Sequence, residues 1–346
     1  MKILVVGPSW VGDMVMSQSL YMALKQHYPD AQLDVLAPDW CRPLLERMPE
    51  VDNALRMPLG HGDLKLGVRR KLGLELAKQG YDWAITQPNS MKSALVPFFA
   101  KIPRRTGWKG ESRYWVLNDR RDNKLDFPLM VERYVSLAFP AEEMTNATKL
   151  PSYPHPKLSA DIDNQQQQLR QLNLKQDRPI LAMCPGAEFG PAKRWPEQHY
   201  AEVARVWIEQ YNGQVWIFGS NKDAAVADAI KAHLDDAQQA HCRSLAGRTQ
   251  LADAIDLMAC ANLAISNDSG LMHIAAALGL PLIAVYGSSS PEYTPPLSEV
   301  TATLHTDIGC RPCFKKTCRF GHNKCLTELS PSHAISAIEL LLGKPA

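Results

Sequence analysis

Short apolar runs recur along this chain, and each is followed by a longer segment whose apolar residues have helical spacing. In the N-terminal half, Lys2–Gly7, Leu33–Ala37 and Asp82–Gln87 predict buried strands. Met14–His27 predicts a helix that ends near Tyr28-Pro29, because proline disfavours further helix. Alternation of this kind is typical of a parallel sheet covered by helices.

The second half repeats the same pattern. Its predicted strands are Ile180–Cys184, Gln214–Phe218, Leu263–Ser266 and Leu282–Tyr286. Glu197–Tyr211 and Leu251–Ala261 predict helices between them, and Ser330-Pro331 begins a predicted terminal helix. Residues 140–179 are rich in proline and polar side chains, which is typical of a domain boundary. We therefore predict an α/β protein with two Rossmann-like domains, residues 1–160 and 161–346, facing a central ligand-binding cleft.

Length and charge agree with this plan and exclude some functions. A chain of 346 residues exceeds the size at which one core usually stops growing. The 38 Lys and Arg residues nearly balance the 36 Asp and Glu residues, so we expect no nucleic-acid partner. Gly7-Pro8 interrupts the first apolar run, and no run approaches the length of a membrane span. We expect a cytoplasmic protein whose membrane contact, if any, is peripheral.

The turn after the first predicted strand is Gly7-Pro8-Ser9-Trp10-Val11-Gly12-Asp13. It lacks the G-x-G-x-x-G spacing of dinucleotide-binding turns, which argues against a dehydrogenase. Asp13 lies near a helix N-terminus, where the helix dipole keeps a carboxylate ionised, so it can accept a proton from a sugar hydroxyl. The alternative is that Asp13 only caps the helix.

A second loop, Pro185-Gly186-Ala187-Glu188-Phe189-Gly190-Pro191-Ala192-Lys193-Arg194-Trp195-Pro196, joins a predicted strand to a predicted helix. Gly186 and Gly190 permit tight backbone. Lys193 and Arg194 supply cationic donors for a diphosphate whose charge grows as it leaves. Alternatively, the two cations are an ordinary solvated pair.

A third loop, Asn267-Asp268-Ser269-Gly270-Leu271-Met272-His273, lies between an apolar strand and an Ala-rich helix. The backbone amides of its central residues suit the oxygens of a pyrophosphate; these residues are Ser269, Gly270 and Leu271. Asp268 is placed to orient a sugar or ribose hydroxyl, and His273 lies one turn into the helix. The alternatives are a capping aspartate and a packed histidine.

Two further clusters stand out. Between residues 61 and 121 there are thirteen Lys and Arg residues against five acidic ones, which suits an anionic glycolipid; Arg69, Arg70 and Lys71 are the candidate contacts, with a solvated helix face as the alternative. Near the C-terminus, four cysteines have spacing close to that of structural zinc sites, with free thiols or disulfides as alternatives. They are Cys310, Cys313, Cys318 and Cys325.

The three loops together resemble the ADP-heptose:lipopolysaccharide heptosyltransferase family across nearly the whole chain, most closely its members that add the second heptose. The resemblance implies a GT-B fold and transfer, with inversion, from ADP-L-glycero-D-manno-heptose to the first heptose of heptosyl-Kdo2-lipid A. It further implies an acceptor met at the inner face of the inner membrane.

The resemblance assigns roles to residues of this chain. Asp13 becomes the base, and Lys193 with the 269–271 amides stabilises the leaving ADP, so neither cofactor nor catalytic metal is expected. The turn from Phe218 to Asp223 lies where the family holds the adenosine ribose, often with a glutamate that this chain lacks, so Asn221 or Asp223 must serve. The expected donor contacts are Gly12, Gly186, Lys193, Arg194, Gly219, Asp223, Asp268, Ser269, Gly270, Leu271 and His273.

Other functions remain open from the sequence. The enzyme could act at another position of the core, or be a nucleotide-sugar epimerase on the same two-domain plan. An epimerase needs no acceptor, and the basic cluster speaks against it. A non-catalytic binding protein is a further alternative, in which Asp13 would be replaceable.

Overall fold

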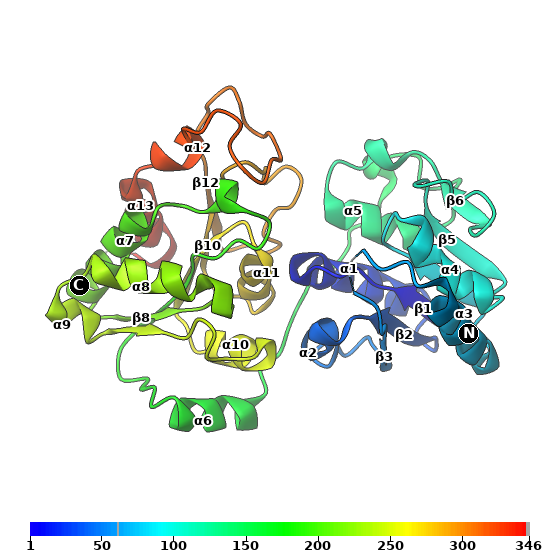
Figure 1. The fold of residues 1–346 in the computed structure, drawn as a ribbon, viewed down its shortest axis with the longest axis horizontal. Helices are drawn as coiled ribbons and strands as arrows, with labels where there is room; N and C mark the ends of the chain where they lie inside the picture. The colour runs from blue at the N-terminus through cyan, green and yellow to red at the C-terminus, as the bar shows by residue number, and fades with distance from the viewer. Residues whose placement is uncertain (61, 344–346) are drawn as a thin grey trace. The chain divides into compact units, whose positions relative to one another are not determined.

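The computed structural model of the protein describes residues 1–60 and 62–343. It divides into two compact units, Met1–Lys157 and Leu158–Ala346. The expected boundary after residue 160 lies in the same stretch of chain. Each unit is built on one six-stranded sheet in which every strand pair is parallel (Figure 1).

In the N-terminal unit the strand order is β3-β2-β1-β4-β5-β6. The strands are β1 (Lys2–Val6), β2 (Gln32–Ala37), β3 (Asn53–Arg56), β4 (Trp83–Thr86), β5 (Arg104–Trp108) and β6 (Asp119–Arg121). The helices are α1 (Val11–His27), α2 (Arg42–Leu45), α3 (Leu66–Leu76), α4 (Met91–Phe99) and α5 (Met130–Val135). The central strands β1 and β4 are almost wholly buried because helices cover both faces of the sheet.

In the C-terminal unit the strand order is β12-β11-β10-β7-β8-β9. The strands are β7 (Ile180–Cys184), β8 (Gln214–Ile217), β9 (Cys242–Ser244), β10 (Leu263–Asn267), β11 (Leu282–Val285) and β12 (Thr301–Leu304). The helices are α6 (Ile162–Gln171), α7 (Glu197–Gln210), α8 (Ala224–Ala232), α9 (Asp236–Gln239), α10 (Leu251–Met258), α11 (Gly270–Ala277), α12 (Lys324–Thr327) and α13 (Pro331–Leu342). Four buried tryptophans and tyrosines, Trp195, Tyr200, Trp207 and Trp216, fill the space around the central strands.

All seven strands expected from apolar runs are present, and each end agrees with the prediction to within one residue. The structure adds five short strands, β3, β5, β6, β9 and β12, that have few apolar residues. The predicted polar boundary also contains a helix, α6, whose N-cap Asp161 accepts hydrogen bonds from the amides of Asp163 and Asn164. Within residues 1–60 and 62–343, no helix has the length and apolar character that a membrane crossing requires.

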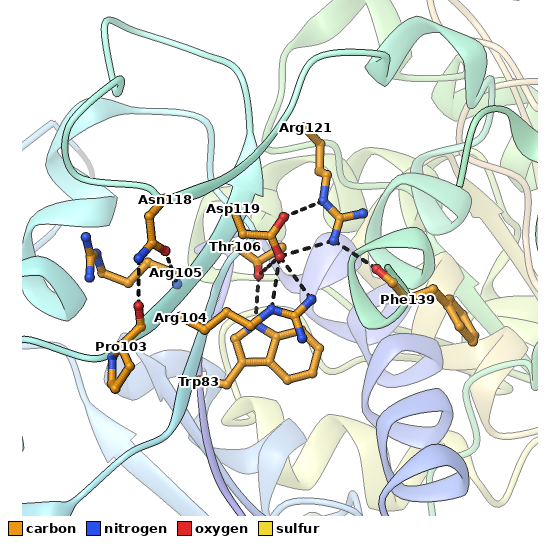
Figure 2. Close-up of polar contacts among 9 residues, drawn as sticks. All are labelled: Trp83, Pro103, Arg104, Arg105, Thr106, Asn118, Asp119, Arg121 and Phe139. Atoms are coloured by element: carbon orange, nitrogen blue, oxygen red, sulfur yellow. Dashed lines mark hydrogen bonds and ion pairs between the residues drawn. The ribbon is translucent and has the colours of Figure 1, made fainter. Parts of the chain in front are cut away.

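Strands β5 and β6 show how charged segments can still pair (Figure 2). Asp119 on β6 accepts hydrogen bonds from Thr106, from Arg104 at 3.0 Å and from Arg121 at 2.9 Å. Trp83 on β4 donates its indole N–H to the Thr106 hydroxyl at 2.7 Å, which extends the network into the sheet. These arginines neutralise a half-buried carboxylate, so the pKa of Asp119 is held below its usual value despite burial.

Candidate active site

Asp13 stands in the first turn of α1, at the carboxyl end of β1. The N-cap of α1 is Trp10, which makes no side-chain cap bond, so the alternative that Asp13 is the cap residue is wrong. Gly12 precedes it in the same turn. The Cys41 thiol is buried and lies near Asp13. Burial, with a smaller contribution from the negative charge of Asp13, raises the pKa of Cys41 to about 12. The helix dipole at this position favours a negative charge, so the Asp13 carboxylate is suited to accept a proton.

In the C-terminal unit, Lys193 and Asp268 form one ion pair. The ammonium lies 2.5 Å from Oδ2 of Asp268, and also 5.0 Å from the centre of the Phe189 ring. The Asp268 side chain is only 4% exposed, and the Lys193 side chain is 16% exposed. The two loops that the sequence singled out separately are therefore joined at their charged residues. Lys193 is not a solvated cation, and Asp268 is not the helix cap.

The first turn of α11 provides the expected amide cluster. Ser269 is the N-cap in extended conformation, and Gly270 and Leu271 begin the helix. Amides in the first turn of a helix have no partner within the helix, and the dipole there favours an anion. The arrangement suits the oxygens of a diphosphate.

His273 lies inside this helix and is 4% exposed. Burial lowers its pKa to about 4; the positive charge of Lys193 acts in the same direction, and Asp268 opposes it. The imidazole is therefore neutral at pH 7. His273 therefore occupies the position of a histidine packed in the protein interior, which was the alternative prediction.

The sequence predicted no separate role for Asn267, but in the structure its side chain holds a loop in place. Its side chain donates to the Pro185 carbonyl at 2.6 Å and accepts from the Trp195 amide at 3.1 Å. One buried amide side chain thus holds both ends of the 185–196 loop against β10. The sequence signal was a polar residue at the end of an otherwise apolar strand, but its partners are distant in sequence.

Gly186 and Gly219 both lie against the carboxylate of Asp223. A Cβ at Gly186 would meet the Asp223 carboxyl carbon at 2.6 Å, and one at Gly219 would meet its Cβ at 2.8 Å. Asp223 also accepts from the amide and hydroxyl of Ser220, at 2.9 and 2.7 Å. A side chain at Gly186 would displace the Asp223 carboxyl group, and one at Gly219 would meet the stiffer base of the same side chain.

Arg194 points toward the same carboxylate, with its NH2 nitrogen 3.9 Å from Oδ1 of Asp223. Its Nε is buried and has no hydrogen-bond partner within the described part of the chain. A buried donor without a partner is costly unless a ligand satisfies it. Arg194 therefore stays a candidate contact for an anion beside Asp223.

The basic cluster of the N-terminal unit separates into internal and exposed cations. Arg69 is 4% exposed and donates to the carbonyls of Leu64 and Asp63, so it holds the chain that leads into α3. Arg104, Arg105, Arg113 and Arg121 likewise use their guanidinium groups on carbonyls or on Asp119. Arg70 and Lys71 are exposed on α3. The expected anionic contact therefore stays with Arg70 and Lys71, and Arg69 is corrected to a residue that holds the backbone.

The four C-terminal cysteines and His322 line one small hollow. All four thiols are free, and among residues 1–60 and 62–343 no three His, Cys, Asp or Glu side chains are grouped as a metal ion requires. The zinc site remains a prediction.

The cysteine-rich segment also contacts the 185–196 loop, because the Ala192 amide donates to the Lys316 carbonyl. Gly190, with φ of +152°, has no room for a Cβ at this contact.

Comparison with known proteins gives consistent matches. Residues 69–324 match the family model described as glycosyltransferase family 9 (heptosyltransferase). Lipopolysaccharide heptosyltransferase 2 of Escherichia coli is 51% identical, and lipooligosaccharide heptosyltransferase 2 of Haemophilus ducreyi is 49% identical; the matches cover at least 99% of each chain.

The fold agrees with these matches. The structure of E. coli ADP-heptose LPS heptosyltransferase II superposes with a TM-score of 0.89 at 49% identity, covering 99% of this chain and 98% of that one. A family 9 glycosyltransferase of Veillonella parvula, at 20% identity and a TM-score of 0.85, shares the fold over 99% of this chain and 97% of its own. The fold is α/β, of the GT-B type predicted from the sequence.

Proposed function

Because this chain belongs to glycosyltransferase family 9, the heptosyltransferases, we propose that it transfers heptose from ADP-heptose to the first heptose of the lipopolysaccharide inner core. The observation that carries the proposal is the similarity to heptosyltransferase 2 proteins, which share about half of their residues with this chain over its full length. The epimerase alternative is not favoured, because these relatives are transferases. The donor is ADP-L-glycero-D-manno-heptose, and the acceptor is heptosyl-Kdo2-lipid A.

In the proposed reaction Asp13 accepts the proton of an acceptor hydroxyl. The freed oxygen forms a bond to the anomeric carbon of the donor while the bond from that carbon to the ADP oxygen breaks. A single displacement of this kind inverts the configuration, and the proton leaves Asp13 to water afterwards. The support is the position of Asp13 in the first turn of α1, where the helix dipole favours a negative charge.

Lys193 and the first turn of α11 stabilise the departing diphosphate. As the bond breaks, negative charge grows on the phosphate oxygens. The Lys193 ammonium, held at 2.5 Å by Asp268, is already in place and has little freedom left to lose. The amides of Ser269, Gly270 and Leu271 add donors at the positive end of the helix. We propose that these groups make a catalytic metal unnecessary.

The nucleoside part of the donor is proposed to contact the β8 turn. The Asp223 carboxylate, packed against Gly186 and Gly219, can accept from a ribose hydroxyl with the lone pairs that Ser220 leaves. Arg194 lies beside it with a buried donor. His273 is buried within α11 and neutral at pH 7, so it offers the donor no positive charge.

We assign the acceptor to the N-terminal unit and the nucleotide sugar to the C-terminal unit. The exposed cations Arg70 and Lys71 suit the phosphates and carboxylates of the acceptor glycolipid. Because that acceptor carries lipid A, the proposed place of action is the cytoplasmic face of the inner membrane, with peripheral contact.

The proposal is tested by product analysis. The purified protein is given ADP-heptose with either heptosyl-Kdo2-lipid A or Kdo2-lipid A, and products are identified by mass spectrometry and by NMR of the new anomeric centre. Addition of one heptose to the first acceptor alone, with inverted configuration, supports the proposal. Addition only to the acceptor without heptose would assign the enzyme to the first core position instead.

A further inference from the structure

Two exposed tryptophans stand beside Asp13. Trp10, the N-cap of α1, is 47% exposed, and Trp40, which follows β2, is 49% exposed. Tryptophan is large and apolar, and an exposed indole presents a broad, rigid surface to a ligand. The proposed reaction assigns no role to either indole ring.

Trp40 is held in place by the Asp13 loop itself. Its indole Nε1 donates to the Ser9 carbonyl at 2.8 Å, and the neighbouring Cys41 Sγ lies 3.8 Å from the same oxygen. Cys41 is also near enough to Asp13 for the carboxylate charge to act on its thiol. The β1 and β2 strands are adjacent and parallel, so the turns that follow them meet at one edge of the sheet. Trp40, Ser9 and Asp13 therefore form one local group.

The Trp40 ring is anchored by its N–H and remains partly exposed. One edge of the indole is fixed to the backbone, while about half of the side chain remains open to solvent. The nearby Asp39 carboxylate is paired with Arg56 at 2.7 Å, which reduces the negative charge beside the ring. A rigid aromatic face beside a general base suits a sugar ring, whose C–H groups lie against the indole while its hydroxyls stay hydrated.

We infer that Trp40, together with Trp10, forms a stacking platform for the acceptor heptose, and that it holds the reacting hydroxyl toward Asp13. The inference rests on the proposed function, since it names residues on the acceptor side of that site. Trp40 is thereby a binding residue for the acceptor. It is not expected to contact the adenine or phosphates of the donor, which are assigned to the C-terminal unit.

The test compares Trp40→Leu and Trp40→Phe with Trp115→Leu. Trp115 is a matched control because it is 85% exposed in the same unit but lies between β5 and β6, separated from β1 by β4. With a deacylated heptosyl-Kdo2 oligosaccharide as acceptor, Trp40→Leu should raise the acceptor KM about tenfold and leave the ADP-heptose KM unchanged. Trp40→Phe keeps a ring and should lose less. Trp115→Leu should behave as the wild type.

Tryptophan fluorescence gives a readout that does not depend on turnover. The same oligosaccharide should quench a part of the emission that is missing in Trp40→Phe, and ADP alone should leave that part unchanged. Quenching of this part by ADP, or a wild-type acceptor KM in folded Trp40→Leu, would overturn the inference. A wild-type enzyme that transfers nothing to any acceptor would instead refute the proposed function, so the two failures are distinguishable.

Discussion

The two units share one topology and differ in what their loops carry. Read from the β9 edge, the C-terminal strand order is β9-β8-β7-β10-β11-β12, which repeats the N-terminal order β3-β2-β1-β4-β5-β6. In the N-terminal unit a short turn after the first strand leads to a carboxylate, Asp13, beside exposed tryptophans. In the C-terminal unit a long loop after the first strand carries Lys193, which is largely buried and paired.

The difference fits the opposite chemical roles that we propose for the two loops. A carboxylate that must receive a proton from a solvated acceptor needs access, and Asp13 is only partly buried. A cation that must stabilise growing charge acts best when it is fixed and partly dry, and Asp268 and Phe189 hold Lys193 in that way. Four predictions test this division between the units.

The largest effect is expected at Asp13. Asp13→Asn removes the base but keeps size and helix position, so kcat should fall about 10³-fold while the Kd for ADP-heptose, measured by calorimetry, stays unchanged. Asp30→Asn, an exposed carboxylate after α1, serves as the control and should be silent. Near-normal turnover in Asp13→Asn would refute its role as base.

A smaller loss, shared between binding and turnover, is expected at Lys193. Lys193→Ala should lower kcat about 10²-fold and weaken ADP binding, because leaving-group charge is no longer offset. It also leaves the buried Asp268 carboxylate unpaired, so the melting temperature should fall. Lys231→Ala on α8 is the matched lysine control. If Lys193→Ala changed neither ADP affinity nor kcat, the proposed function of the ion pair would be wrong.

Stability should depend on pH through His273. Its pKa is about 4 in the folded protein and near 6.5 when unfolded, so the unfolded chain binds more protons between these values. The stability is fully present above pH 6.5 and is lost as the pH falls toward 4. Between pH 7.5 and 5 we expect a loss of about 2 kcal/mol in unfolding free energy from this group. Urea unfolding of the wild type and His273→Asn measures it, and equal pH dependence in both would contradict the assignment.

The smallest effects separate exposed from internal cations in the N-terminal unit. Arg70→Ala and Lys71→Ala should each raise the acceptor KM about two- to fivefold at low salt, less at high salt, with unchanged melting temperature. Arg69→Ala should instead lower the melting temperature, because the Leu64 and Asp63 carbonyls lose their donor. Steady-state kinetics at two salt concentrations, with thermal unfolding, distinguish the two classes. An Arg70 variant that only unfolds more easily would reverse the assignment.

Much of the fold could be predicted because the central strands of parallel sheets are continuous apolar runs, as in β1 and β7. The edge strands could not. Strand β6 is Asp119-Arg120-Arg121, and its charges are satisfied by partners on β5 and beyond, which no local pattern records. The short strand β9 was missed for a similar reason, since it contributes few apolar residues.

The site shows the same limit. The residue types and loops of Asp13, Lys193 and Asp268 were evident from the sequence, because each follows a predicted strand. The pairing of Lys193 with Asp268 was not, since the two are distant in sequence and the motif suggested separate roles. The internal use of Arg69 was hidden as well, because a run of cations on a helix looks the same whether its members face water or a backbone carbonyl.

We propose acceptor-dependent heptosyl transfer in which protein groups, not a metal, stabilise the leaving ADP. The most direct test is ADP release by the purified protein from ADP-heptose in EDTA, with and without heptosyl-Kdo2-lipid A. We predict rapid release only when that acceptor is present, with no loss caused by EDTA. Release that stops in EDTA and returns with a divalent ion, or that proceeds equally without acceptor, would contradict the account.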